Sequence, residues 1–321
     1  MKYLITGSSG FWGLNLVNHI LKKEEDPEII CVYKHNNNCL KNLQVKTVQC
    51  CLENKNEVNK LYDNYDYIIH LASIIKHTLN NSEENIRINI NSTINLLELT
   101  KKIKLNNKKI RFILASTIGT VSCFENNLEY SNEYSEYSKR SINFPYYYSK
   151  IQMEKIALDY SDKYSIDLVI IRPPVIFGPN DPKGRATRLI KKFINNKIIL
   201  YGSGNIPFCD VRDLCSLTYE IILHNSPKKI YNIDGTNWTM KKFYDVLESI
   251  SNEDKIKLWI PYYLGYYGIL ILRNCFNLYD IIEIEMAHSY WNSKSCHKLI
   301  NKWIDPEKTL LDTLKDIKSK L

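Results

Sequence analysis

The feature that most constrains this chain is a glycine-rich turn near its start. A strand-like run, Lys2–Thr6, leads into three glycines at GxxGxxG spacing, and apolar residues at helical spacing follow. Glycine permits the tight turn and lets backbone approach a pyrophosphate, while the helix N-terminus offers unpaired N–H groups to an anion. This strand–turn–helix context predicts a dinucleotide-binding site lined by Gly7, Ser9, Gly10, Phe11, Trp12 and Gly13.

Strand and helix patterns alternate over the first half of the chain, which predicts βαβ units and a parallel sheet. A long helix is expected around residues 86–97 and another from about Tyr146. After Arg172 prolines and glycines crowd a loop and the alternation ends. We therefore predict a Rossmann-type doubly wound α/β fold: a single domain, 1–321, with a smaller C-terminal substrate lobe built mainly from residues 173–321. Strands are expected at Lys2–Thr6, Glu28–Tyr33, Val45–Gln49, Tyr67–Leu71, Ile110–Ala115 and Asp167–Ile171.

Cysteine content and charge narrow the classes of function. The nine cysteines form no CxxC pair, and no histidine cluster has metal-ligand spacing, so we expect reduced thiols, a cytoplasmic location and no metal. The net charge of +8 is spread along the chain, which favours solvated lysines over a nucleic-acid-binding surface. Segment 259–272 is apolar but too short to span a bilayer, which leaves a buried helix or an interfacial contact. We expect no signal peptide and no membrane span.

The end of the second predicted strand bears on cofactor choice. An acidic residue there would hold the adenosine ribose and favour NAD. The chain instead reads Val32-Tyr33-Lys34-His35, without a carboxylate. Lys34 could pair with a 2′-phosphate, so we expect NADP, with NAD possible; the alternative is that Lys34 is one more surface lysine.

Tyr146 and Lys150 are one helical turn apart and so share a face of the predicted helix. A free phenol has a pKa of about 10, and a nearby ammonium favours the phenolate. Tyr146 could then exchange a proton with an alcohol or carbonyl oxygen while hydride moves to or from a nicotinamide, and Lys150 could also hold the cofactor ribose. Thr117, after the fifth strand, supplies a hydroxyl for the reacting oxygen and completes the predicted catalytic set.

Two arginines are candidates for binding substrate. Arg172 ends the sixth strand and could be either a buried structural cation or a substrate-side anchor. Arg185 follows the Pro/Gly loop and could bind a substrate phosphate. The simpler interpretation is that its side chain is exposed to solvent and binds no ligand.

Several segments, taken in order, resemble the extended short-chain dehydrogenase/reductase family, also called the NAD-dependent epimerase/dehydratase family. They are Thr6–Gly13, His70–Ser73, Asn89 with the helix that follows it, Tyr146–Lys150, Arg172–Pro179, Phe208–Asp213 and Tyr231–Gly235. The resemblance implies a small-molecule substrate and a possible homodimer. It also implies further cofactor contacts from Leu71, Ala72, Ser73, Asn89, Pro173 and Val175.

The chain departs from the family pattern at three places. Cys51 stands where the family usually has an Asp near the adenine. Ile118-Gly119 replaces the Asp-Glu pair of the sugar dehydratases, so 4,6-dehydration lacks its acid and base. Val175 stands where many nucleotide-sugar epimerases carry Asn.

These residues lead us to expect an NAD(P)-dependent ketone reductase or secondary-alcohol dehydrogenase acting on an activated sugar or a related small carbonyl compound. Two enzymatic alternatives stay open: a nucleotide-sugar epimerase, and an enzyme like 3β-hydroxysteroid dehydrogenase or dihydroflavonol reductase. A non-catalytic NADP-binding sensor is a further alternative, which the presence of both Tyr146 and Lys150 disfavours.

Overall fold

The computed structural model describes residues 1–77, 82–106, 109–184, 186–265, 267, 281–297 and 303–320. Its centre is a seven-stranded sheet in the order β10-β6-β5-β4-β1-β2-β3, and every neighbouring pair is parallel. This is the predicted doubly wound arrangement, and each predicted strand lies within one residue of an observed one. The strands are β1 (Lys2–Thr6), β2 (Glu28–Tyr33), β3 (Lys46–Gln49), β4 (Tyr67–His70), β5 (Arg111–Ala115), β6 (Asp167–Arg172) and β10 (Ile230–Asn232).

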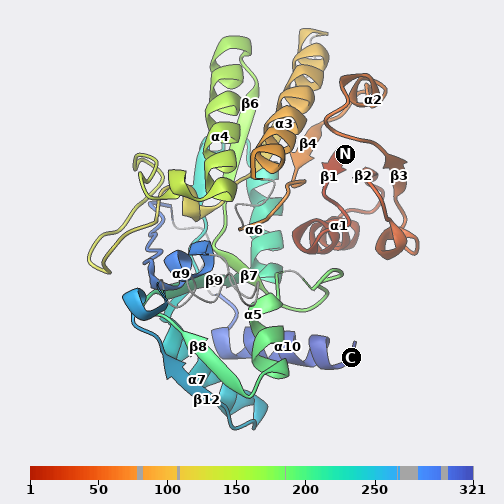
Figure 1. Ribbon diagram of the computed structural model, residues 1–321. Coiled ribbons are helices and arrows are strands. Elements are labelled where there is room, and N and C mark those ends of the chain that lie inside the picture. Colours follow the sequence, from red (N-terminus) through yellow and green to blue (C-terminus); the bar gives the residue numbers. More distant parts are fainter. Residues whose placement is uncertain are drawn as a thin grey trace.

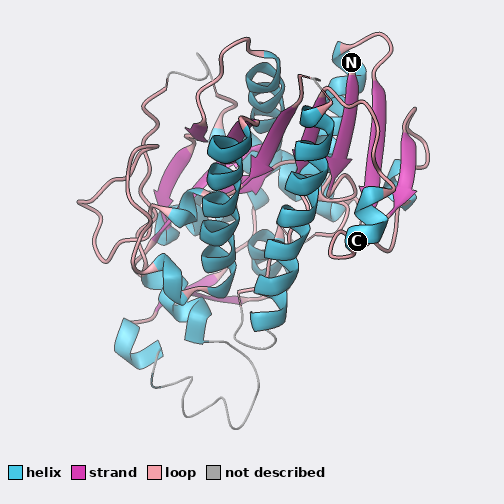
Figure 2. Cartoon of the chain, turned by 90° about the horizontal axis from the view of Figure 1, so that it is seen from above, coloured by secondary structure: helices cyan, strands magenta, loops and turns pink. Residues whose placement is uncertain are grey.

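Helices cover both faces of this sheet, because apolar side chains of its strands point alternately to the two faces and must be buried on each. In β1, Tyr3 and Ile5 point to one face and Leu4 to the other, and all three are fully buried. The first face packs against α1 (Phe11–Lys23) and α6 (Val211–Leu223). The second packs against α2 (Lys55–Asn59), α3 (Ser82–Leu105) and α4 (Pro145–Tyr164), and the two long helices α3 and α4 lie side by side across it (Figure 2).

Local sequence sets the ends of the helices that matter most. Helix α4 begins with Pro145 at its first position, where a missing N–H costs nothing, and ends at Ser165 in a left-handed conformation (φ 53°). Helix α10 (Pro306–Lys318) begins after Asp305, whose carboxylate accepts hydrogen bonds from the backbone N–H groups of Glu307 and Lys308.

A second, smaller lobe lies beyond the carboxyl ends of the main strands (Figure 1). Its core is rich in phenylalanine, with Phe177, Phe193, Phe208 and Phe243 all buried. Although they lie within residues 173–321, α6 and β10 belong to the main lobe, so the two lobes interleave along the chain. The smaller lobe contains β7 (Val175–Phe177), α5 (Arg188–Asn195), β8 (Ile198–Tyr201), β9 (Asn205–Asp210), β11 (Thr236–Thr239), α7 (Met240–Ser251), β12 (Ile256–Trp259), α9 (Ile281–His288) and α10.

The eight cysteines in the described ranges are free thiols. Within those ranges no helix has the length and apolarity needed to cross a membrane, and no three His, Cys, Asp or Glu side chains gather as a metal site would require. In the apolar segment 259–272, Trp259 ends β12, while residues 266 and 268–272 fall outside the described part of the chain.

Candidate active site

The carboxyl ends of β1, β4 and β5 place the predicted site residues at one edge of the main sheet. In a doubly wound sheet the ligand crevice lies outside these ends, where the strand order reverses. Here the reversal falls between β1 and β4, because the chain adds β2 and β3 on one side of β1 and continues through β4 and β5 on the other. The smaller lobe lies beyond this edge (Figure 1).

The glycine turn follows β1 and has the shape that a pyrophosphate needs. Gly7 has a φ of +72°, and a Cβ there would lie 2.6 Å from the backbone nitrogen of Ala72. A Cβ at Gly13 would overlap the backbone of Gly7, so this glycine lets α1 pack against the turn. No side chain caps the N-terminus of α1, and its first turn contains no acidic residue. Its N–H groups are therefore available to an anion.

Two buried polar atoms near this turn support the same fit. Trp12 Nε1, in the first turn of α1, and Ser73 Oγ, after β4, are buried without a hydrogen-bond partner in the structure. Such atoms are costly unless a ligand satisfies them. With the open helix terminus, they make the predicted residues of the turn and of the β4 loop compatible with a dinucleotide.

A buried network holds the loop after β4 in place. His70 contacts Thr6 Oγ1 through Nδ1 (2.8 Å) and Thr93 Oγ1 through Nε2 (3.2 Å). Burial lowers the pKa of His70 to about 3, so this imidazole is neutral. The Thr6 hydroxyl also accepts a hydrogen bond from the backbone N–H of Ala72. His70 is thus a packing residue, and the loop that begins at Leu71 starts from a fixed position.

Asn89 was expected among the cofactor contacts, and in the structure its side-chain amide is hydrogen-bonded to groups of the protein. Its Oδ1 accepts from the N–H of Ile74 (2.7 Å), and its Nδ2 donates to the Ile74 carbonyl (3.2 Å) and to Ser149 Oγ (3.0 Å). Ser149 Oγ donates in turn to the carbonyl of Tyr146 (2.7 Å). Because these bonds use both polar atoms of a side chain that is 2% exposed, Asn89 is a positioning residue that ties the β4 loop to α4.

Tyr146 and Lys150 lie where α4 crosses the end of β5, and Thr117 follows that strand. Lys150 Nζ donates to the carbonyl of Ala115 (2.7 Å), two residues before Thr117, and lies 5.9 Å from the centre of the Tyr146 ring. Thr117 begins the short helix η2 (Ile118–Thr120), and its Oγ1 accepts from the N–H of Gly119 (3.2 Å). The three side chains thus belong to one region, and the lone-pair capacity that remains on Thr117 Oγ1 suits it to a further partner.

Burial shifts the proton affinities of this pair in opposite directions. The Lys150 side chain is 2% exposed, and desolvation lowers its pKa to about 7, partly countered by the Glu154 carboxylate one turn further along α4. Desolvation also raises the pKa of the Tyr146 phenol above its usual value. In this state Tyr146 is a protonated phenol, and Lys150 changes charge near neutral pH. Shifted pKa values of this kind are typical of functional sites, but the raised pKa of Tyr146 opposes the phenolate that the nearby ammonium was expected to favour.

Arg172 was expected either as a structural cation or as a substrate anchor, and the structure favours the first. It is 2% exposed and forms two hydrogen bonds to Glu154, Nε to Oε1 (2.9 Å) and NH2 to Oε2 (2.6 Å). Ser116 Oγ donates to the same carboxylate. Because Glu154 neutralises its charge inside the protein, we no longer expect Arg172 to contact substrate. Glu154 was not among the residues predicted from the sequence, although it stands four residues after Lys150, on the same helix face.

Three more residues were predicted to contact cofactor or substrate: Pro173, Val175 and Arg185. Pro173 is buried, and its carbonyl accepts from the N–H of Ile118 (3.1 Å), which joins β6 to the Thr117 turn. Val175 lies in β7 and is 37% exposed. Arg185 lies outside the described residues.

His77 is a site residue that the sequence analysis did not select. Its ring centre lies 5.2 Å from that of Tyr146, edge-on, and 5.4 Å from that of Tyr147. Its Nδ1 is buried without a hydrogen-bond partner, and burial, with a smaller effect of Arg188, lowers its pKa to about 4. His77 is therefore a neutral imidazole beside the candidate acid–base residue. The sequence shows only that His77 follows β4. It does not show where the loop turns, so the contact between His77 and Tyr146 could not be predicted.

A cavity of about 650 Å³ lies at the ends of β2 and β3, where the adenosine end of a dinucleotide would lie. Lys34, His35 and Lys60 line it, together with Cys51, which stands at the expected place. Its one carboxylate, Glu57, accepts hydrogen bonds from Cys51 N (2.7 Å) and Asn54 Nδ2 (2.9 Å). The basic residues thus outnumber the acidic one, and the acidic one is already engaged by local N–H groups.

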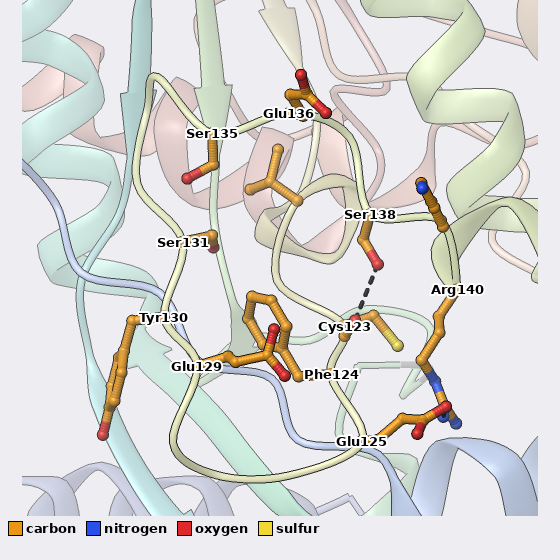
Figure 3. Close-up of a pocket in the computed structure, with 12 residues that line it drawn as sticks. Cys123, Phe124, Glu125, Glu129, Tyr130, Ser131, Ser135, Glu136, Ser138 and Arg140 are labelled. Atoms are coloured by element: carbon orange, nitrogen blue, oxygen red, sulfur yellow. Dashed lines mark hydrogen bonds and ion pairs between the residues drawn. The ribbon is translucent and has the colours of Figure 1, made fainter.

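A further cavity, of about 350 Å³, is formed by the segment between η2 and η3 (Ser141–Asn143), and Figure 3 shows it. Ser138 Oγ donates to the carbonyl of Cys123 across it (2.8 Å), and Arg140 pairs with Glu125 at its rim (2.8 Å). None of the predicted catalytic or cofactor residues lines this cavity. We therefore place the candidate active site at Tyr146, Lys150 and His77, where titratable groups with shifted pKa values lie together.

The sequence profile of the NAD dependent epimerase/dehydratase family matches residues 3–234 of this chain. A dTDP-D-glucose 4,6-dehydratase of Dictyostelium discoideum is 29% identical over 276 residues, which cover 78% of this chain and 62% of that protein. The chain thus spans less than two thirds of that relative's length. A CDP-paratose 2-epimerase of Salmonella typhi is 25% identical, with 79% of this chain and 86% of that protein covered.

A similar solved structure is that of a dTDP-glucose 4,6-dehydratase from Bacillus anthracis in complex with NAD. It has a TM-score of 0.76 at 20% sequence identity, with 99% of this chain and 97% of that chain covered. At this level of identity the likeness concerns the fold alone, and it extends over both lobes.

Proposed function

Because this chain belongs to the NAD-dependent epimerase/dehydratase family, whose members are enzymes, we propose that it is a nucleotide-sugar epimerase. Such an enzyme removes a hydride from a carbon bearing a hydroxyl and returns it to the opposite face. The observation that carries this proposal is the Tyr146–Lys150 pair at the carboxyl edge of β5, with Lys150 buried and Tyr146 half-buried. The relatives support epimerisation over the ketone reduction that we expected from the sequence.

In this proposal Tyr146 carries the proton. The bound nicotinamide supplies a reversible hydride acceptor. Tyr146 takes the proton from the substrate hydroxyl during oxidation and gives it back during reduction, while Thr117 Oγ1 holds the same oxygen. Lys150, fixed by the Ala115 carbonyl, would hold the cofactor ribose and, in its protonated form below about pH 7, would place a positive charge near the phenol. The turn at Gly7, Gly10 and Gly13 and the loop at Leu71, Ala72 and Ser73 would hold the rest of the cofactor.

Dehydration is a weaker candidate for this chain, although a dehydratase is among its relatives. Ile118 and Gly119 follow Thr117, and neither can donate or accept a side-chain proton. Ile118 is buried, and the backbone of Gly119 packs against the ring of Tyr147. The turn therefore leaves no place for an acid–base pair at these positions.

An NADP-dependent reductase is the second candidate, and the cavity at the adenosine end favours it. The exposed side chain of Lys34 and the neighbouring His35 and Lys60 could bind a 2′-phosphate, while Glu57 is engaged by the backbone of Cys51. The family is NAD-dependent, so NADP preference is a proposal about this chain alone. A reductase would consume one reduced cofactor for each product molecule, whereas an epimerase would consume none.

The test is to incubate the purified protein with UDP-, dTDP- and CDP-sugars in deuterated water, with NAD or NADP added in parallel, and separately with NADPH and a panel of carbonyl compounds. An epimerase forms an isomer of the sugar without net change in nicotinamide absorbance and without deuterium at the inverted carbon. Stoichiometric loss of NADPH with a carbonyl substrate would favour the reductase. Cofactor binding without turnover on either panel would refute both and leave a non-catalytic sensor.

Two further expectations remain proposals. We propose a cytoplasmic location, from the free thiols in the described ranges. We also propose a homodimer formed through the outer faces of α3 and α4, which the family resemblance suggested. Sedimentation equilibrium tests the dimer, and a monomer at micromolar concentration would contradict it.

A further inference from the structure

A loop of the smaller lobe reaches across to the glycine turn. It follows β7 and includes residues 178–184, and two contacts join it to the main lobe. Lys183 Nζ lies 3.4 Å from Ser9 Oγ, within the glycine turn itself. Asn15, on α1, donates from Nδ2 to the carbonyl of Asn180 (3.3 Å). The loop thus carries an ammonium group from one lobe to the anion-binding turn of the other.

Asp181 orders this loop. Its carboxylate is buried, at 5% exposure, and accepts hydrogen bonds from the backbone N–H groups of Lys183, Gly184, Ala186 and Thr187 at 3.0–3.2 Å. It also accepts from the hydroxyl of Thr187 (3.2 Å). A carboxylate that gathers this many donors fixes the backbone of the segment, so the position of Lys183 is determined by the fold.

The charge at this place has no counterpart within the described protein. Lys183 forms no ion pair with any described carboxylate, and it lies close to the N-terminus of α1, which carries its own partial positive charge. It also lowers the pKa of Cys39, whose thiol approaches the Ser9 carbonyl, although burial of Cys39 outweighs this effect. Two positive groups held side by side repel each other unless an anion lies between them.

We propose that Lys183 is a cofactor-binding residue whose ammonium contacts the pyrophosphate of the dinucleotide held at the glycine turn. Through this contact, the loop ordered by Asp181 ties the smaller lobe to the bound cofactor. The inference rests on the proposed cofactor site, and it does not depend on the chemistry assigned to Tyr146. Because the glycine turn itself supplies backbone N–H groups, the Ser9 hydroxyl and a helix terminus but no charged side chain, Lys183 adds the full charge that this part of the site otherwise lacks.

The experiment is a fluorescence titration of the full chain with NADH, NADPH, ADP-ribose and adenosine, so no substrate is needed. Lys183→Ala should raise the Kd for the three ligands that contain a pyrophosphate by about tenfold, as expected for one charge-assisted hydrogen bond at an exposed side chain. Binding of adenosine should not change. Lys183→Arg should restore most of the affinity, and the wild-type Kd should rise more steeply with salt than that of the alanine variant.

Lys23→Ala is the matched control, because it removes an exposed lysine at the opposite end of the same helix α1. It should bind all four ligands as the wild type does. Equal affinities of Lys183→Ala and wild type for NADH and ADP-ribose would overturn the proposal, as would an equal loss for adenosine. A wild type that binds none of the dinucleotides would instead overturn the proposed cofactor site.

Discussion

Replacing Lys150 with methionine tests the buried ammonium through the pH dependence of stability. The wild-type pKa is about 7 in the folded protein, against 10.5 for an ordinary lysine, because the side chain is 2% exposed. Between these two pH values the unfolded chain binds a proton that the folded chain does not, so folding stability rises with pH. The variant lacks this group. The free energy of unfolding of the wild type, relative to the variant, should therefore increase by about 2 kcal/mol from pH 7 to pH 9.

The assay is urea unfolding followed by circular dichroism at several pH values, with the free energy extrapolated to water. Lys155→Met, which removes an exposed lysine from the same helix, is the control and should differ from the wild type by a constant amount. The reasoning about Lys150 fails if the difference between wild type and Lys150→Met is flat across this range. Such a result would mean that the ammonium stays hydrated after folding.

Three other predictions follow from the same cluster and from the adenosine end. Glu154→Gln should lower the free energy of unfolding by about 3–5 kcal/mol, because it leaves the buried Arg172 without a counter-charge; a loss below about 1 kcal/mol in urea unfolding would contradict this. Thr117→Val should lower kcat by about 10²-fold while the Kd of the cofactor, measured by titration, stays the same. Lys34→Asp should weaken NADPH binding by about tenfold and strengthen NADH binding, and equal effects on both cofactors would refute a 2′-phosphate contact.

The sequence was sufficient to predict every strand of the main sheet except β10, because the signals of those strands are local. The glycine turn and the periods of the helices each depend on residues that are neighbours in the chain. The Tyr146–Lys150 pair belongs to the same class, since two residues four apart on a helix must share a face. Strand ends were accurate to one residue for the same reason.

The contacts that the sequence analysis missed join segments far apart in the chain. Arg172 of β6 pairs with Glu154 of α4. The side-chain amide of Asn89 is hydrogen-bonded to the β4 loop and to Ser149. Neither residue type reveals its partner in a single sequence. The smaller lobe was the least predictable part, because its strands are short and α6 and β10 return to the main sheet.

The most direct test of the account is the single-turnover reaction of Tyr146→Phe. The purified protein, loaded with oxidised cofactor, is mixed with the nucleotide sugar that the panel identifies, and the reduction of the bound nicotinamide is followed by stopped-flow absorbance. The account predicts that the phenylalanine variant retains the wild-type Kd for the cofactor and reduces it at least about 10²-fold more slowly, because a positioned acid–base group is lost. Reduction at the wild-type rate would contradict the central claim that the Tyr146 phenol carries the proton.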